Sequence, residues 1–218
     1  LAHDLPNSYV GVGADRRAVA AAVIGMHAID VAVMDDGLQH GAVDRDLDIA
    51  MFNALDPVGN GSLLPEGIMR EPLEGLHRAG VVVLHHANLA PPSHVQYMKH
   101  QLGQYCRPGA QVLLSEMSAH GLTRLRDFAH GHHEMLPGAD ALKGKSIYTF
   151  SGVGNPEALH LTVEKWGMVT MTRDFGDHHF YTERDYKTIR SDVCTLQKLA
   201  PNKGVALVTT EKDFHRCS

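Results

Sequence analysis

The chain has 218 residues, 44% of them hydrophobic and 21% charged, so it is long enough to bury the core of one large domain or two small ones. Its formal net charge of −5 gives no basic surface for nucleic acid, and we expect no nucleic-acid partner. Three cysteines without a CxxC pair argue against a disulfide framework and a cysteine-based zinc site. No stretch reaches the roughly 18 continuous apolar residues of a membrane-spanning helix.

Apolar, β-branched segments alternate with helical patterns along the chain. We expect strands or strand-like apolar segments at residues 8–13, 30–36, 47–54, 80–86, 110–118, 146–151, 168–175 and 204–213. We expect helices at residues 15–27, at 92–105, after the glycine-rich turn at 152–154, and at 182–200. The first can be capped by Asp15, and the last begins with a capping box formed by Thr182 and Asp185. This alternation predicts an α/β protein with a parallel sheet.

In a parallel sheet, ligands bind at the carboxyl ends of the strands. Polar and ligand-type residues follow the expected strands in this chain, at 35–36, 85–86, 152–154, 174–177 and 209–211. We therefore expect the functional side chains to gather at this edge.

The segment "VAVMDDGLQH" (31–40) places two aspartates after an apolar run. Carboxylates in this position typically hold the Mg²⁺ that bridges nucleotide phosphates, as in a Walker-B motif. The alternative is a loop carboxylate that caps a helix, because many strands end in Asp. A Walker-A string, G-x-x-x-x-G-K-[ST], is absent from the chain. The turn "SGVGNPEA" offers backbone N–H groups to an anion, or it only turns the chain before Pro156.

Two further stretches carry candidate chemistry. Arg70 lies in a loop rich in glycine and proline, and its planar guanidinium suits phosphate, although it could instead pair with Glu71 or another carboxylate. In "DFGDHHFY", Asp177 and His178 suit general-base work, with the orienting carboxylate coming from Asp177 or from elsewhere in the chain. The chain has 16 histidines, but their clusters lack a recognised zinc spacing, which disfavours a metal-dependent hydrolase.

Six stretches in this order resemble the tetraacyldisaccharide 4'-kinase family, the lipid A 4'-kinases. They run from about residue 10 to residue 213 and read "VMDDGLQH", "RDLDIAMFNA", "GNGSLLPEGIMREPL", "FSGVGNPEAL", "FGDHHFYTERD" and "LVTTEKD". The stretch "VVLHHANL" is more similar to plant and algal versions than to bacterial ones.

The resemblance implies a role for each matching residue. Asp35 and Asp36 match the Walker-B pair that binds Mg²⁺ and the phosphates of ATP, and Gln39 and His40 complete that motif. Arg70 matches the arginine of the "REP" motif, which implies a phosphate or transition-state contact. His178, beside Asp177, matches the histidine of a catalytic dyad whose aspartate lies upstream of residue 10 in the family, as does the P-loop.

The resemblance also implies an architecture and a reaction. The fold is a P-loop-kinase-like parallel sheet with helices on both faces, plus a smaller α/β domain. We expect a partial kinase core at 1–125, a linker at 126–145 and a smaller domain at 146–218. The reaction is ATP-dependent phosphorylation of the 4'-hydroxyl of a lipid A disaccharide precursor by a monomer at a membrane surface.

The resemblance also implies where in the cell the protein acts. The membrane would be the cytoplasmic face of the bacterial inner membrane, or the protein would lie in a plant or algal mitochondrion or plastid. Because the chain lacks an initial Met and a Walker A, we expect a fragment with impaired activity. The alternatives are an inactive α/β binding scaffold and a P-loop phosphotransferase that acts on a soluble substrate.

Overall fold

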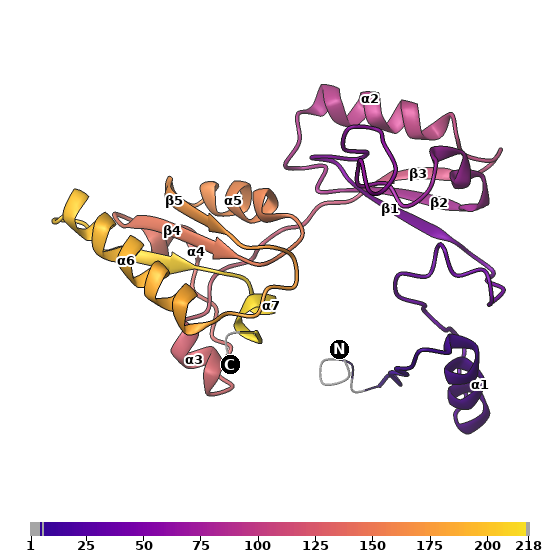
Figure 1. Cartoon of the computed structure of the whole chain (residues 1–218), viewed down its shortest axis with the longest axis horizontal. Helices are drawn as coiled ribbons and strands as arrows, with labels where there is room; N and C mark the ends of the chain where they lie inside the picture. The colour runs from indigo at the N-terminus through magenta and orange to yellow at the C-terminus, as the bar shows by residue number, and fades with distance from the viewer. Residues whose placement is uncertain (1–4, 6, 217–218) are drawn as a thin grey trace. The chain divides into compact units, whose positions relative to one another are not determined.

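The computed structural model describes residue 5 and residues 7–216. These residues form two compact units, each built from several stretches of chain (Figure 1). The N-terminal unit comprises residues up to 52, together with 56–84 and 96–113; the C-terminal unit comprises 53–55, 85–95 and 114 onward. The last passage from the first unit to the second falls between Leu113 and Leu114. The three-part division at 1–125, 126–145 and 146–218 stays a prediction.

The N-terminal unit begins with helix α1 (Arg16–Met26), which confirms the helix expected at 15–27. Asp15 caps it as predicted, because its carboxylate accepts hydrogen bonds from the backbone N–H groups of Arg17 and Ala18. No residue of α1 is buried. Its cap and its alanines favour the helix locally, without burial of an apolar face.

The strands predicted at 8–13 and 30–36 are wrong for the described chain, because both segments are irregular. Val12 is 90% exposed and Val33 is 91% exposed. A strand requires a neighbouring strand for its backbone hydrogen bonds, and within the described residues neither segment pairs with one. The Asp35–Asp36 pair therefore lies in a turn after an exposed apolar segment, not after a buried strand.

The first sheet has the strand order β1-β2-β3, with β1 (Ile49–Asn53), β2 (Val81–His85) and β3 (Gln111–Leu114). The hydrogen bonds advance in the same direction along neighbouring strands, from Gly80 N with Asp48 O to Ala54 N with His85 O, so β1 and β2 are parallel. Helix α2 (Pro92–Gly103) runs alongside this sheet, and a 3₁₀ helix, η1 (Leu73–Arg78), precedes β2 (Figure 1). These elements confirm the strands expected at 47–54 and 80–86 and the helix at 92–105.

The second sheet has the order β5-β4-β6 and is parallel, with β4 (Ser146–Ser151), β5 (Val169–Asp174) and β6 (Val205–Val208). All six residues of the central strand β4 are buried. A strand with no exposed face is typical of a parallel sheet covered on both sides. The strand predicted at 204–213 is too long, because Thr210 caps a short helix, α7 (Glu211–Phe214), and the chain leaves the sheet after Val208.

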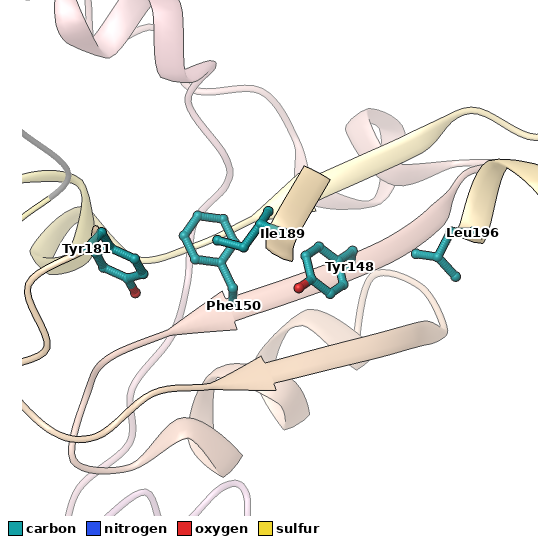
Figure 2. Packing of buried hydrophobic residues seen from close by; sticks show 5 residues of the cluster. All are labelled: Tyr148, Phe150, Tyr181, Ile189 and Leu196. Atoms are coloured by element: carbon teal, nitrogen blue, oxygen red, sulfur yellow. The ribbon is translucent and has the colours of Figure 1, made fainter. Parts of the chain in front are cut away.

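Side chains that alternate along β4 enter two different hydrophobic clusters. Tyr148 and Phe150 pack with Tyr181 and with Ile189 and Leu196 of helix α6 (Glu183–Leu199), as Figure 2 shows. The intervening Ile147 packs in a second cluster, whose other members are Leu142, Val163 and Val208. Because successive side chains of a strand point to opposite faces, the two clusters cover the two faces of the sheet. The predicted α/β class is confirmed.

Val163 of the second cluster belongs to helix α5 (Pro156–Glu164), so a helix contributes to each cluster. Both helices have the predicted starts. Asn155 caps α5 with Pro156 as its first residue, and Thr182 and Asp185 form the capping box of α6. Residues 126–145 lie within the C-terminal unit and include most of α3 (Leu125–Ala129) and all of α4 (Gly138–Leu142).

In the described part of the chain, every helix is too short or too polar to traverse a lipid bilayer.

Candidate functional site

The turn that carries the two aspartates opens onto a pocket of about 240 Å³ in the N-terminal unit. The residues that line it come from α1, from the turn and from the loop before η1, and they are Arg16, Asp36, Gln39, His40 and Arg70. Four of these five residues are candidates from the sequence. The structure therefore brings the "DDGLQH" stretch and the "REP" arginine to one place although they are about 30 residues apart in sequence.

Asp36 and Arg70 form the central ion pair of this pocket. Nη1 of Arg70 donates a hydrogen bond to Oδ1 of Asp36 at 2.6 Å, and Nη1 of Arg16 donates to the backbone oxygen of Asp36 at 3.4 Å. The hydrogen bond from Arg70 holds the pKa of the Asp36 carboxyl below its ordinary value, with smaller charge effects from both arginines. The Arg70 and Asp36 side chains are 57% and 60% exposed. An ion pair so open to water adds little to stability, so both charges are accessible to a ligand.

His40 also lines this pocket. Its Nε2 atom is buried and has no hydrogen-bond partner among the described residues. Its backbone oxygen is held by Arg45, which also pairs with Asp48. A buried ring nitrogen without a partner costs free energy.

Glu71 does not pair with Arg70, although the sequence allowed this pairing. Its carboxylate accepts hydrogen bonds from Nη2 of Arg78 at 2.7 and 2.8 Å and from Nε2 of Gln39 at 2.7 Å. Burial opposes the charge of Glu71, but these hydrogen bonds outweigh it and lower the pKa of the carboxyl. Arg70 pairs with Asp36 instead, and Glu71 anchors Gln39 at the pocket wall.

The carboxylates of Asp35 and Asp36 provide oxygen atoms of the kind that bind a magnesium ion. Mg²⁺ prefers oxygen ligands and commonly takes only one or two carboxylates, with phosphate oxygens and waters as its other ligands. Asp35 is exposed. Arg70 donates a hydrogen bond to Oδ1 of Asp36, and Oδ2 is the other oxygen of the same carboxylate. In the described residues there is no group of three or more histidine, cysteine or acidic side chains suited to a metal.

The Asp177–His178 pair lies in the C-terminal unit, in the loop after β5. Oδ2 of Asp177 is 3.6 Å from Nε2 of His178, while Oδ1 accepts a hydrogen bond from the backbone N–H of His178 at 2.9 Å. His178 has a φ of +60°, a left-handed conformation that non-glycine residues rarely adopt. Asp36 (φ +50°) and His86 (φ +62°) share it.

Two residues of this edge are absent from the sequence prediction. Asp213 is completely buried, and its carboxylate accepts hydrogen bonds from Gly152 N, from the hydroxyl of Tyr181 and from the hydroxyl of Thr210. Arg216 donates from Nη1 to the backbone oxygen of Gly152 and from Nη2 to Nδ1 of His178. The Thr-x-x-Asp spacing of "TEKD" is a helix-cap signal that could have identified Asp213, whereas no local pattern indicates Arg216.

The candidates therefore form two sets in the described chain. Asp35, Asp36, Gln39, His40 and Arg70 belong to the N-terminal unit, and Asp177 and His178 belong to the C-terminal unit. Within the first set, the pocket lining includes every member except Asp35. The second set shares the carboxyl edge of its sheet with Gly152, Asp213 and Arg216.

The family model and the similar proteins found by comparison all point to one family. The model of the family described as "Tetraacyldisaccharide-1-P 4'-kinase" matches residues 1–218. A tetraacyldisaccharide 4'-kinase of Anaeromyxobacter sp. (strain K) is 36% identical over 218 residues, which are 99% of this chain and 54% of that protein. A probable mitochondrial tetraacyldisaccharide 4'-kinase of Arabidopsis thaliana is 33% identical over 185 residues, which are 84% of this chain and 45% of that protein.

A solved structure is also similar. The crystal structure of "apo" form LpxK from Aquifex aeolicus in complex with ATP is 23% identical, with a TM-score of 0.46, over 84% of this chain and 47% of that one. The chain thus spans about half the length of the relatives that it matches.

Proposed function

Because the chain belongs to the tetraacyldisaccharide-1-P 4'-kinase family, we propose that, with the remaining length that its relatives have, it transfers the γ-phosphate of ATP to the 4'-hydroxyl of a tetraacyl disaccharide 1-phosphate. The observation that carries this proposal is the pocket in which Asp36 and Arg70 pair and which Gln39 and His40 also line. Its arginines suit phosphate, and the carboxylate of Asp36 suits Mg²⁺.

Phosphoryl transfer depends mostly on positioning and on neutralising charge on the transferred group. In the proposal, Asp35 and Asp36 hold Mg²⁺, which neutralises phosphate charge when it is bound. Arg70 offers its remaining N–H groups to a phosphate oxygen, and Gln39 and His40 contact the same ligand. His178 takes the proton of the attacking hydroxyl, with Asp177 beside its Nε2.

The proposed fold of the complete protein is P-loop-kinase-like, with the phosphate-binding loop and the dyad aspartate in the half of the relatives that this chain does not cover. The proposed setting is peripheral association of a monomer with a membrane surface, because the acyl chains of the substrate require an apolar environment. This surface would be the inner membrane of a bacterium, or the protein would lie in a mitochondrion or plastid. A mitochondrial relative from Arabidopsis thaliana supports the second possibility.

Transfer of labelled γ-phosphate tests the proposal. The assay compares the 218-residue chain with a protein extended to the length of its relatives, using the lipid disaccharide as acceptor. We expect transfer by the extended protein and little by the shorter chain, because P-loop amides and lysine hold the β- and γ-phosphates in this class of kinases. Equal rates would contradict the impairment of the shorter chain. Transfer to soluble sugars but not to the lipid would support the soluble-substrate alternative.

A non-catalytic binding scaffold is the second candidate, and the exposure of Val31 and Val33 favours it because exposed apolar segments often contact a partner. Thermal unfolding of the 218-residue chain with and without Mg-ATP separates the two functions. A ligand that binds the folded state raises its unfolding temperature. A rise with Mg-ATP supports a nucleotide site in this chain, and an unchanged temperature supports the scaffold.

A further inference from the structure

Arg216 joins three carboxyl ends of the second sheet. Its Nη1 donates to the backbone oxygen of Gly152, which follows β4, at 2.8 Å, and its Nη2 lies 3.0 Å from Nδ1 of His178, which follows β5. Arg216 itself follows α7, the helix after β6. The backbone N–H of His178 also donates to the oxygen of Gly152, at 3.2 Å, so one carbonyl fixes both the arginine and the histidine.

The buried Asp213 holds this arrangement in place. Its backbone oxygen accepts a hydrogen bond from Arg216 N at 2.9 Å, and its carboxylate accepts one from Gly152 N at 2.8 Å. Asp213 has no exposed surface, so water does not compete for these bonds. The arginine therefore approaches His178 from a backbone that is anchored to the core.

The contact with Arg216 determines which nitrogen of His178 carries the proton. A guanidinium only donates hydrogen bonds, so Nδ1 of the imidazole must be unprotonated to accept one. The neutral ring then carries its proton on Nε2, the atom that lies 3.6 Å from Oδ2 of Asp177. The His178 side chain is 72% exposed, which leaves Nε2–H accessible to a ligand.

We propose that Arg216 is a positioning residue that holds His178 in its Nε2–H tautomer. Its hydrogen bond keeps Nδ1 from accepting another proton until the guanidinium moves away. This inference rests on the proposed function for its role in catalysis. While Arg216 is in place, His178 donates from Nε2 and accepts no proton. When Arg216 leaves, the lone pair of Nδ1 takes the hydroxyl proton of the substrate. Nε2 keeps its own proton, and the resulting imidazolium lies beside the Asp177 carboxylate.

Nitrogen NMR of the 218-residue chain labelled with ¹⁵N-histidine tests the tautomer without any substrate. The His178 signals are assigned by their loss in His178→Gln. We expect a single Nε2–H tautomer in the unsubstituted chain and a mixture of tautomers in Arg216→Met, which removes all donors at similar length. Arg216→Lys should restore the single tautomer, because an ammonium group also only donates. Unchanged His178 signals in Arg216→Met would overturn the proposal.

Arg190→Met, on the exposed side of α6, is the matched control and should leave the His178 signals unchanged. If Arg216→Met fails to fold, Arg216→Gln is measured instead, and the same mixture is expected because its amide oxygen can also accept from the ring. In the extended protein, we expect Arg216→Met to lower kcat by only about two- to threefold, because part of the population keeps the Nε2–H tautomer, and we expect Arg216→Lys to recover this loss. If Arg216→Lys recovers none of the lost kcat, the proposed role of Arg216 in catalysis is wrong.

The His178 NMR signals and the rate of phosphate transfer test the role of Arg216 and the proposed function separately. If the unsubstituted extended protein transfers no phosphate, the kinase proposal fails while the tautomer result stands. If the extended protein is active but Arg216→Met changes neither kcat nor the His178 signals, the kinase proposal stands and the role of Arg216 is wrong.

Discussion

The sequence predicts a strand both at residues 30–36 and at β4, but the two segments have opposite structures. In β4 every residue is buried between β5 and β6, with helices contributing to the clusters on both faces. In 30–36, Val31 and Val33 are 79% and 91% exposed, and no strand of the described chain pairs with them. The comparison shows that an apolar, β-branched run becomes a strand only where neighbouring strands accept its hydrogen bonds and helices cover it.

The carboxylates near these two segments differ in the same way. Asp36 is exposed and uses one oxygen for Arg70, so its other oxygen is open to a ligand. Asp213 is fully buried and its two oxygens are satisfied by three hydrogen-bond donors of the chain itself. The first arrangement suits binding, while the second suits holding three strand ends together.

The largest expected effect is on the packing of β4. Phe150→Ala removes a ring that packs edge-to-face against Tyr181, and it should lower the free energy of unfolding by about 3–5 kcal/mol. Val33→Ala is the control and should change it by less than about 0.5 kcal/mol, because this side chain is exposed. Denaturant unfolding followed by the fluorescence of Trp166, which packs in the C-terminal unit, measures the first effect.

For Val33→Ala the same titration is followed by circular dichroism, because Trp166 belongs to the other unit. A loss of several kcal/mol in Val33→Ala would show that residues 30–36 are buried in the protein in solution, and it would remove the contrast.

The next effect concerns catalysis in the extended protein. Asp36→Ala should reduce kcat on the order of 10²–10³-fold, because it removes a carboxylate proposed to hold Mg²⁺ and the partner of Arg70. Steady-state transfer of labelled phosphate measures this loss, and unfolding of the same variant should be nearly unchanged because the pair is exposed. A loss below about threefold would argue against the magnesium role.

A smaller loss of stability is expected at the buried carboxylate. Asp213→Asn keeps the shape of the side chain but replaces one acceptor oxygen with an amide, beside the hydroxyl of Thr210 or of Tyr181. We expect the free energy of unfolding to fall by about 1–3 kcal/mol, since a buried hydrogen bond is lost or inverted. Trp166 fluorescence in denaturant is again the measurement. A fully stable variant would show that Asp213 does not tie the strand ends together.

The smallest effect is at the start of α6. Thr182→Ala removes the hydroxyl of the capping box and should cost about 1 kcal/mol of unfolding free energy. The bonds from Thr182 lower the pKa of Asp185 to about 2, with a smaller contribution from His179. A carboxyl with a lowered folded-state pKa stabilises above its ordinary pKa, and this contribution disappears as the pH falls through about 2.

Thermal unfolding at pH 7, pH 4 and pH 2 checks the acid part of this prediction. The difference in unfolding temperature between the unsubstituted chain and Thr182→Ala should shrink toward pH 2, because protonated Asp185 no longer benefits from the donors of Thr182. A difference that stays constant over this range would assign the effect to the Thr182 hydroxyl alone.

Local signals in the sequence predicted local structure well. Asp15 and Thr182 cap their helices as predicted, because a cap is formed by residues within four positions of one another. The strands at 8–13 and 30–36 were predicted wrongly, since strand formation depends on partners distant in sequence. Four of the five pocket residues followed from a resemblance to a family and from residue chemistry, and Arg16 did not. The contact of Arg216 with His178 spans 38 positions and has no sequence pattern.

The left-handed backbone of Asp36, His86 and His178 limits which replacements these positions tolerate. Asparagine and glycine adopt this conformation readily, but a β-branched residue would clash with its own backbone. Natural variation at the three positions should therefore favour Asn, Asp, His and Gly over Val, Ile and Thr. For the experimenter, asparagine removes the charge or the ring while the turn keeps its shape, so any loss of activity can be assigned to chemistry.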